Sequence, residues 1–213
     1  MGYFPVYLDL RGRHCVVIGD DDEAQMKAGA LVEAGAVVTV ISPMERPRFT
    51  EMAEQGHITL HSRNYEPGDL KDAFLAISAT THDRPLSEAI KAEAEREKCL
   101  LNVVDITDLC TWIYPALVRR GDATVAISTN GRSPAMASFL RREIDEALPA
   151  EYGMLLDVLA DVRADLRRDG KSPSSSRWQT ALNDDKTRTL ISAGDEAGLR
   201  DRLVALLTDG SGG

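Results

Sequence analysis

Residues 16–27 read VVIGDDDEAQMK, an apolar run followed by one glycine and four consecutive acids. The run, together with the cysteine before it, predicts a buried strand over residues 15–18. Small and apolar residues then recur at helical spacing over residues 24–34, and Gly35 ends this predicted helix. A strand, a glycine turn and a helix in direct succession indicate the opening unit of a parallel α/β sheet.

The alternation of short apolar runs with amphipathic stretches continues as far as residue 104. Strands are predicted at residues 37–41, 58–60, 74–79 and 100–104, and helices at 48–55 and 85–98. Right-handed crossovers between such units give a doubly wound sheet. Ligands of these sheets bind at the carboxyl ends of the strands. Those ends carry Gly19, Ser42-Pro43, Ala79-Thr80-Thr81 and Asp105.

The pattern changes after residue 111. A strand is predicted at residues 123–128, helices at 134–148, 152–168, 177–182 and 196–207, a Gly/Ser/Pro breaker at 170–176 and a frayed tail at 209–213. The chain therefore divides into three predicted parts: an α/β domain over residues 1–112, a short strand–helix segment over 113–150 and a helical C-terminal domain over 151–213.

The charge of the chain excludes some classes of partner. Of its 213 residues, 25 are basic and 34 acidic, which gives a formal net charge of −9. We therefore expect no nucleic acid and no membrane as the main partner, because both attract basic surfaces.

The cysteines and the N-terminus indicate a compartment. There are three cysteines, an odd number, and Cys15 and Cys99 lie in apolar runs, so free buried thiols in a reducing compartment are expected. The absence of a CxxC pair or a Cys/His cluster means that no metal site is predicted. No long apolar run follows the N-terminus, so we expect a cytoplasmic protein.

The glycine turn has the spacing of a phosphate-binding loop but unusual residues. A G-x-G-x-x-A loop uses its first glycine to turn and its second to let the backbone approach a pyrophosphate. Gly19 and Ala24 occupy the first and last positions, whereas Asp21 occupies the middle one. A carboxylate ~4 Å from a phosphate charge costs about 4 kcal/mol at an effective dielectric constant of about 20. Asp20 and Glu23 also have the spacing of a capping box, in which carboxylates satisfy the N–H groups at the start of a helix.

Several longer segments form a characteristic set. They are FPVYLDLRGRHCVVIG at residues 4–19, the stretch at 24–43, FLAISATTHD at 74–83, LNVVD at 101–105 and IYPALVRRGDATVAISTNGRSPAMASFLRREIDEALP at 113–149. In these segments the chain resembles, over about its whole length, the precorrin-2 dehydrogenase/sirohydrochlorin ferrochelatase family, the N-terminal module of siroheme synthases. The resemblance implies a Rossmann-like NAD-binding domain, a central dimerisation segment and a helical domain that together form a homodimer.

The same resemblance implies an activity. It is the NAD-dependent oxidation of the tetrapyrrole precorrin-2 to sirohydrochlorin in siroheme biosynthesis, followed in some members by insertion of Fe²⁺, which is then a substrate. NAD is the implied cofactor.

The resemblance also implies roles for individual residues. The aspartate of the NVVD motif, Asp105, is the implied catalytic residue, and its alternative is a turn or helix cap after the strand. Cofactor contacts are implied at Gly19, Asp21, Asp22, Glu23, Pro43, Met44, Ala79 and Thr80. Arginines of the central segment are expected to bind substrate carboxylates, unless they pair with acids of the following helix; the candidates are Arg119, Arg120, Arg132 and Arg141.

Three interpretations stay open because the acids of the loop oppose a bound dinucleotide. The first is an NAD-dependent dehydrogenase whose loop tolerates the acids. The second is a sirohydrochlorin chelatase or tetrapyrrole-binding relative without NAD. The third is a dimeric scaffold without activity.

Overall fold

The structure is a computed structural model that describes residues 2–80 and 82–208, so Thr81 and the tail predicted at 209–213 lie outside the described residues. Contacts within the chain divide it into two compact units, residues 1–114 and 115–213. Each unit has its own sheet and its own helices.

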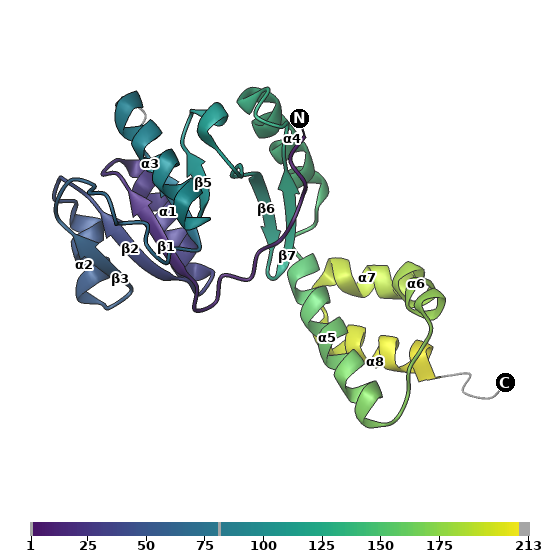
Figure 1. The fold of residues 1–213 in the computed structure, drawn as a ribbon. Helices are drawn as coiled ribbons and strands as arrows, with labels where there is room; N and C mark the ends of the chain where they lie inside the picture. The colour runs from purple at the N-terminus through teal and green to yellow at the C-terminus, as the bar shows by residue number, and fades with distance from the viewer. Residues whose placement is uncertain (1, 81, 209–213) are drawn as a thin grey trace. The chain divides into compact units, whose positions relative to one another are not determined.

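The first unit is built on a parallel five-stranded sheet with the strand order β3-β2-β1-β4-β5 (Figure 1). The strands are β1 (His14–Ile18), β2 (Val37–Ile41), β3 (Ile58–His61), β4 (Leu75–Ser78) and β5 (Leu100–Val103). The helices are α1 (Asp22–Glu33), α2 (Pro47–Glu54) and α3 (Arg84–Glu97), with a short 3₁₀ turn η1 (Thr107–Leu109). This arrangement confirms the predicted doubly wound α/β sheet. The strand order reverses between β1 and β4, the point at which such sheets bind ligands.

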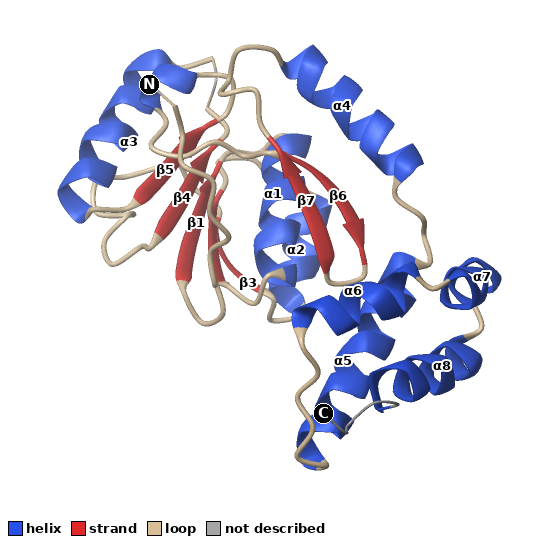
Figure 2. Cartoon of the chain, turned by 90° about the vertical axis from the view of Figure 1, so that its right-hand side faces the viewer, coloured by secondary structure: helices blue, strands red, loops and turns tan. Residues whose placement is uncertain are grey.

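Alternate residues of β1 pack on opposite faces of the sheet. Cys15 and Val17 belong to the core beneath α1 and α2, whereas Val16 and Ile18 belong to the core beneath α3. Figure 2 shows α3 on the side of the sheet opposite to α1 and α2. All four side chains are at most 2% exposed. A strand that is covered on both faces reads as a continuous apolar run, as the sequence does here.

The second unit begins with a β-hairpin and ends with helices. The antiparallel strands β6 (Ala116–Arg120) and β7 (Ala123–Ile127) are followed by α4 (Pro134–Ala147), α5 (Tyr152–Arg168), α6 (Ser175–Asn183), α7 (Asp185–Ala193) and α8 (Glu196–Thr208). Val158 and Val162 of α5 pack with Leu199 and Leu203 of α8 in a separate core. In the described residues no helix is long and apolar enough to cross a membrane.

Two elements of the second unit differ from the sequence prediction. The strand β6 was not predicted, because its pairing with β7 depends on the tight turn at Gly121, which has a φ of +56°. The prediction placed two helices after the one at residues 152–168, whereas the described residues contain three, α6, α7 and α8. It missed α7 because one residue, Asp184, separates α6 from α7 and caps the start of α7 by accepting from the Thr187 N–H.

Candidate functional site

A pocket of about 180 Å³ opens at the carboxyl edge of the sheet, where the strand order reverses. This volume is smaller than the roughly 300–1,000 Å³ of a typical ligand pocket. Its lining comes from the residues after β1, β2 and β4, from the loop after β3 and from the start of α3: Ile18, Gly19, Asp20, Pro43, Asn64, Tyr65, Ala79, Thr80, His82, Asp83 and Leu86.

Gly19 is required by the close approach of the β1 and β4 ends. Its φ is +138°, and a Cβ added there would lie 2.9 Å from the Ala79 Cβ. The backbone is fixed on both sides, since the Gly19 N–H donates to the Ile41 carbonyl at 3.0 Å and the Ala79 N–H to the Ile18 carbonyl at 2.7 Å. Glycine alone fits this position, and its bare backbone is left facing the pocket.

The start of α1 is capped by Asp21. The Asp21 Oδ1 accepts a hydrogen bond of 2.7 Å from the Ala24 N–H, and Asp21 has the extended backbone of an N-cap residue. The capping box predicted for Asp20 and Glu23 is therefore wrong, because the helix begins one residue later than that pairing requires. The Asp21 side chain thus accepts a hydrogen bond from a backbone N–H group at the start of a helix, where such groups can otherwise bind a phosphate.

The other acids of the loop also have partners. Glu23 pairs with Lys27 at 3.0 Å, and the buried Lys27 ammonium lies 3.3 Å from the centre of the Tyr114 ring. Asp20 lies 3.8 Å from the Arg46 guanidinium. The Asp22 Oδ1 accepts a hydrogen bond of 3.3 Å from the Gln25 amide. The charge of the loop is thus partly compensated inside the unit.

The residues after β2 form a compact turn. The buried Ser42 donates its hydroxyl to the Met44 carbonyl at 2.7 Å, which leaves Pro43 and Met44 exposed. Arg46 precedes α2 and makes no side-chain cap hydrogen bond. Its Nε is buried and has no hydrogen-bond partner in the part of the chain that the structure describes.

Hydroxyl groups connect the end of β4 to the start of α3. The Thr80 hydroxyl lies 2.7 Å from the Ser78 hydroxyl and 3.1 Å from that of Ser87, and both serines are fully buried. Asp83 caps α3 by accepting from the Leu86 N–H at 3.0 Å. These bonds connect Thr80 to β4 and α3 and cap the start of α3 beside the pocket.

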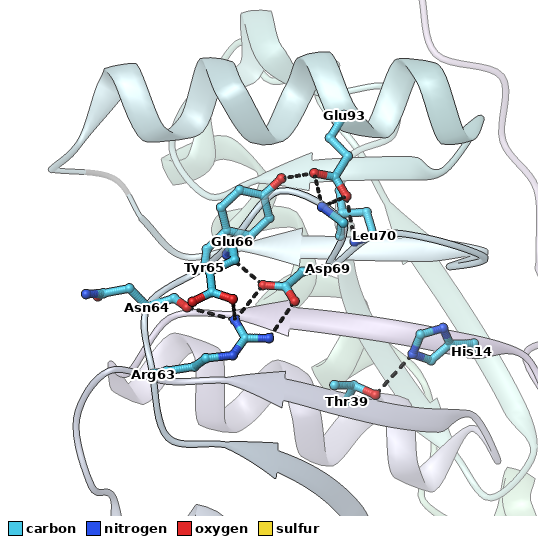
Figure 3. Close-up of polar contacts among 10 residues, drawn as sticks. His14, Thr39, Arg63, Asn64, Tyr65, Glu66, Asp69, Leu70 and Glu93 are labelled. Carbon is cyan, nitrogen blue, oxygen red and sulfur yellow. Dashed lines mark hydrogen bonds and ion pairs between the residues drawn. The ribbon is translucent and has the colours of Figure 1, made fainter.

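The loop after β3 forms another wall of the pocket and was not predicted as part of the site. The Tyr65 hydroxyl donates to the Glu93 carboxylate of α3, which also accepts from the Gly68 N–H at 3.0 Å and the Leu70 N–H at 2.8 Å (Figure 3). The Glu93 side chain is 2% exposed. Burial acts to raise the pKa of Glu93, but these three donors hold the pKa below its usual value.

The same loop is closed by an ion pair. Arg63 donates to both carboxylate oxygens of Asp69, at 2.8 and 2.7 Å, and Asp69 also accepts from the Glu66 N–H at 2.7 Å (Figure 3). The signal in the sequence was the position of SRNYEPGDL directly after a predicted strand, at the edge where ligands bind. This segment was not predicted to line the pocket, because aromatic, Pro and Gly residues in a loop do not by themselves indicate a pocket wall.

The pocket brings together half of the cofactor residues implied by the sequence. Gly19, Pro43, Ala79 and Thr80 line it, whereas Asp21, Asp22, Glu23 and Met44 do not. The bare backbone at Gly19 and the edge position fit a dinucleotide. The negatively charged Asp20 among the lining residues opposes one, as the sequence indicated.

Asp105 follows β5 and is exposed, with a φ of +58°. This left-handed conformation is uncommon for residues other than glycine, although aspartate tolerates it. Asp105 does not line the pocket, and no hydrogen bond of its carboxylate is found among the described residues. Its role as a cap therefore has no hydrogen bond in support, and the catalytic role stays a prediction.

The four arginines that were predicted to bind substrate lie in the second unit and differ in their exposure to solvent. The Arg120 guanidinium donates to the Leu148, Arg119 and Asp145 carbonyls and to the Asp145 carboxylate, over 2.7–3.0 Å. It fastens the end of α4 to β6, as the alternative of pairing with helix acids suggested. Arg119, Arg132 and Arg141 are exposed.

The described residues contain no group of three or more His, Cys, Asp or Glu side chains that could hold a metal ion. Cys15 and Cys99 are buried free thiols, as predicted, and Cys110 is half-buried. Burial raises the pKa of Cys15 to about 11 and that of Cys99 to about 12.

The chain is similar to known proteins over both of its units. The model of a family described as "Putative NAD(P)-binding" matches residues 6–116, and one described as "Sirohaem biosynthesis protein central" matches residues 120–147. Siroheme synthase of Methylococcus capsulatus is 35% identical, with 100% of this chain and 48% of the relative covered. That of Nitrosomonas eutropha is 33% identical, with 98% and 44% covered. The chain thus spans about half the length of the curated relatives it matches.

A solved structure shows the same fold. SirC, a precorrin-2 dehydrogenase, superposes with a TM-score of 0.72 at 23% identity, covering 94% of this chain and 98% of that one. The family model over residues 6–116 covers just over half of the chain and contains all of the pocket described above. The chain therefore belongs to the NAD(P)-binding family of this model.

Proposed function

We propose that the chain oxidises precorrin-2 to sirohydrochlorin with NAD⁺, as a step of siroheme biosynthesis. The observation that carries the proposal is the pocket around Gly19 at the reversal point of the sheet, in a chain of an NAD(P)-binding family. The similarity to siroheme synthases along the whole chain is the reason for proposing precorrin-2 as the substrate. A bound NAD⁺ supplies the hydride acceptor, and the second hydrogen of the substrate leaves as a proton.

Residues of the first unit have distinct roles in this proposal. The Gly19 backbone and the turns at Pro43 and Ala79-Thr80 hold the dinucleotide. Asp105, an exposed carboxylate at the end of a strand, accepts the proton that the substrate releases. The position of Asp105 beyond the pocket suits a group that acts on the substrate rather than on the cofactor.

Residues of the second unit bind the substrate, which is rich in carboxylates. Arg132 and Arg141 are stronger candidates than Arg120, because both are exposed whereas Arg120 is engaged within the unit, and Arg119 is a further candidate. Arginine suits this task since it holds a carboxylate with two parallel hydrogen bonds.

The second unit also supports a homodimer. No residue of α4 is buried, and its Met136 and Phe139 are 45% and 46% exposed. Large apolar side chains in such a position favour an interface between protein chains. We propose that a second copy of the chain covers α4, and light scattering of the purified protein would show twice the mass of one chain.

A specific observation favours a second candidate, a sirohydrochlorin chelatase without a dinucleotide. The Asp21 carboxylate occupies the Ala24 N–H, and Asp20 places a negative charge in the pocket. Both features oppose a pyrophosphate. In this case Asp105 accepts pyrrole protons while Fe²⁺, as a substrate, enters the macrocycle.

One pair of assays separates the two candidates. The purified chain is incubated anaerobically with precorrin-2, with and without NAD⁺, and formation of sirohydrochlorin and NADH is followed. In parallel it receives sirohydrochlorin with Fe²⁺ or Co²⁺. We expect oxidation that depends on NAD⁺. Metal insertion without any oxidation would contradict the dehydrogenase and support the chelatase.

A further inference from the structure

Asp20 is the acid of the loop that affects the pocket most directly. It alone among the four consecutive acids lines the cavity, beside Gly19 and Pro43. The carboxylates of Asp21 and Glu23 are committed to the Ala24 N–H and to Lys27. Asp20 is therefore the acid of the loop that lies closest to a ligand in this pocket.

Arg46 is the basic residue that lies next to the Asp20 carboxylate. Its guanidinium lies 3.8 Å from the Asp20 carboxylate, and the two side chains are 39% and 29% exposed. Asp20 lies close after the end of β1 and lines the pocket, whereas Arg46 lies in the segment between β2 and α2, outside the pocket lining. Because the pair is partly shielded from water, its interaction is screened less than that of a fully exposed pair.

No second bond restrains the Arg46 guanidinium in the described part of the chain. Its Nε is buried without a hydrogen-bond partner, and it does not cap α2. Within the described residues, Asp20 is therefore the polar partner found for the Arg46 guanidinium.

We propose that Arg46 is a positioning residue of the cofactor site, which neutralises Asp20 and so allows the pyrophosphate of an NAD-type dinucleotide to approach Gly19. This inference rests on the proposed function, because it requires that a dinucleotide binds. A neutralised Asp20 would explain how the acidic loop of this chain binds a dinucleotide, as expected for a member of an NAD(P)-binding family. In this account Arg46 acts through Asp20 rather than on the reacting atoms.

A charge cycle tests the proposal. NAD⁺ is titrated calorimetrically into the wild type, Arg46→Ala, Asp20→Asn and the double variant. Arg46→Ala should weaken binding about tenfold, because Asp20 is partly exposed to water, which reduces its repulsion of a phosphate well below the value expected at a dielectric constant of about 20. Adding Asp20→Asn should restore the affinity to within about threefold of Asp20→Asn alone, because the charge that Arg46 offsets is then absent.

Control variants separate this role from folding. Arg48→Ala removes the same charge from the exposed Arg48 side chain of α2 and should leave the affinity unchanged. Thermal unfolding of each variant shows whether it is folded. If Arg46→Ala does not fold, Arg46→Lys and Arg46→Gln replace it, with Lys expected to preserve affinity and Gln to lose it.

The outcomes distinguish the inference from the proposed function. Equal affinity of Arg46→Ala and the wild type contradicts the inference alone, and so does a loss that Asp20→Asn fails to restore. A loss seen with NADP⁺ but not with NAD⁺ also contradicts it, because Arg46 would then bind the 2′-phosphate. No binding of NAD⁺ to the wild type or to Asp20→Asn contradicts the proposed function and the inference together.

Discussion

Single residues decide whether the edge of the sheet can bind a ligand. Gly19 permits the approach of β1 to β4, while its neighbours Asp20 and Asp21 have different tasks although they are chemically identical. Asp21 caps a helix and Asp20 faces the pocket. The sequence indicated the conflict between acids and phosphate. It could not show which acid caps α1, because that depends on where the helix begins.

Replacing Gly19 tests the close approach. Gly19→Ala places a Cβ 2.9 Å from that of Ala79 at a φ of +138°, so we expect the free energy of unfolding to fall by about 2 kcal/mol or more. Urea denaturation measures the change. The matched control is Gly29→Ala inside α1, where the nearest atom is the flexible Arg48 guanidinium and the added methyl group should raise helix stability slightly. Equal stability of Gly19→Ala and the wild type would show that the two strand ends are not in tight contact.

Asp105 offers a test of catalysis that is separate from folding. Asp105→Asn keeps a residue that tolerates the left-handed conformation but removes the charge. We expect the rate of precorrin-2 oxidation to fall at least a hundredfold, with NAD⁺ affinity and unfolding free energy nearly unchanged. Steady-state kinetics and calorimetry provide these values. Full activity of Asp105→Asn would remove Asp105 from the catalytic residues.

At the scale of elements, strands and helices with regular periodicity were predicted reliably from the sequence, whereas elements that depend on tertiary pairing were not. The central strands β1 and β4 are buried on both faces, and the predicted positions of all five strands of the first unit agree closely with the structure. In contrast, β6 depends on its pairing with β7, and α7 follows α6 after a single residue. The wall formed by Tyr65 was missed for a related reason. Its position is set by Glu93, 28 residues farther along the chain.

The attachment of that wall to α3 depends on pH. Because the pKa of Glu93 is lower in the folded state than its usual value, the ionised carboxylate stabilises the fold above the unfolded-state pKa of about 4.3. This contribution is lost as the pH falls through the folded-state pKa. Glu93→Gln should therefore lower the free energy of unfolding by about 2 kcal/mol at pH 7, with a difference that shrinks toward pH 3. Chemical denaturation at several pH values measures it, and a difference independent of pH would contradict the role of the charge.

At the scale of the molecule, the two units have separate cores and separate tasks in the proposal. The first unit carries the pocket and Asp105, and the second carries the exposed arginines and α4. The sequence predicted three parts, with a change of pattern after residue 111, and the further division of residues 113–213 into a central segment and a helical domain stays a prediction. It offered pairing of the arginines with helix acids as an alternative, but it could not show that Arg120 is the one engaged, because this depends on how the end of α4 packs against β6.

Thiol reactivity reports on global opening of the first unit. Cys15 and Cys99 are 0% and 4% exposed, and burial raises the pKa of both thiols to about 11 and 12. A thiol that is inaccessible and protonated at pH 8 does not react. We expect these two cysteines to be labelled only as fast as the unit unfolds, and all three to react at once in denaturant. Mass spectrometry of labelled peptides identifies them, and fast labelling of Cys15 in native protein would contradict the core described here.

The central claim is that the acidic loop still binds a dinucleotide, and titration of NAD⁺ into the wild type by calorimetry tests it most directly. The companion is the Asp20→Gly/Asp21→Gly variant, in which glycine keeps most of the capping at position 21 while both charges are removed. We predict micromolar binding by the wild type and tighter binding by the variant. No binding by the wild type, with binding restored in the variant, would show that the chain has kept the fold of its family and lost the cofactor.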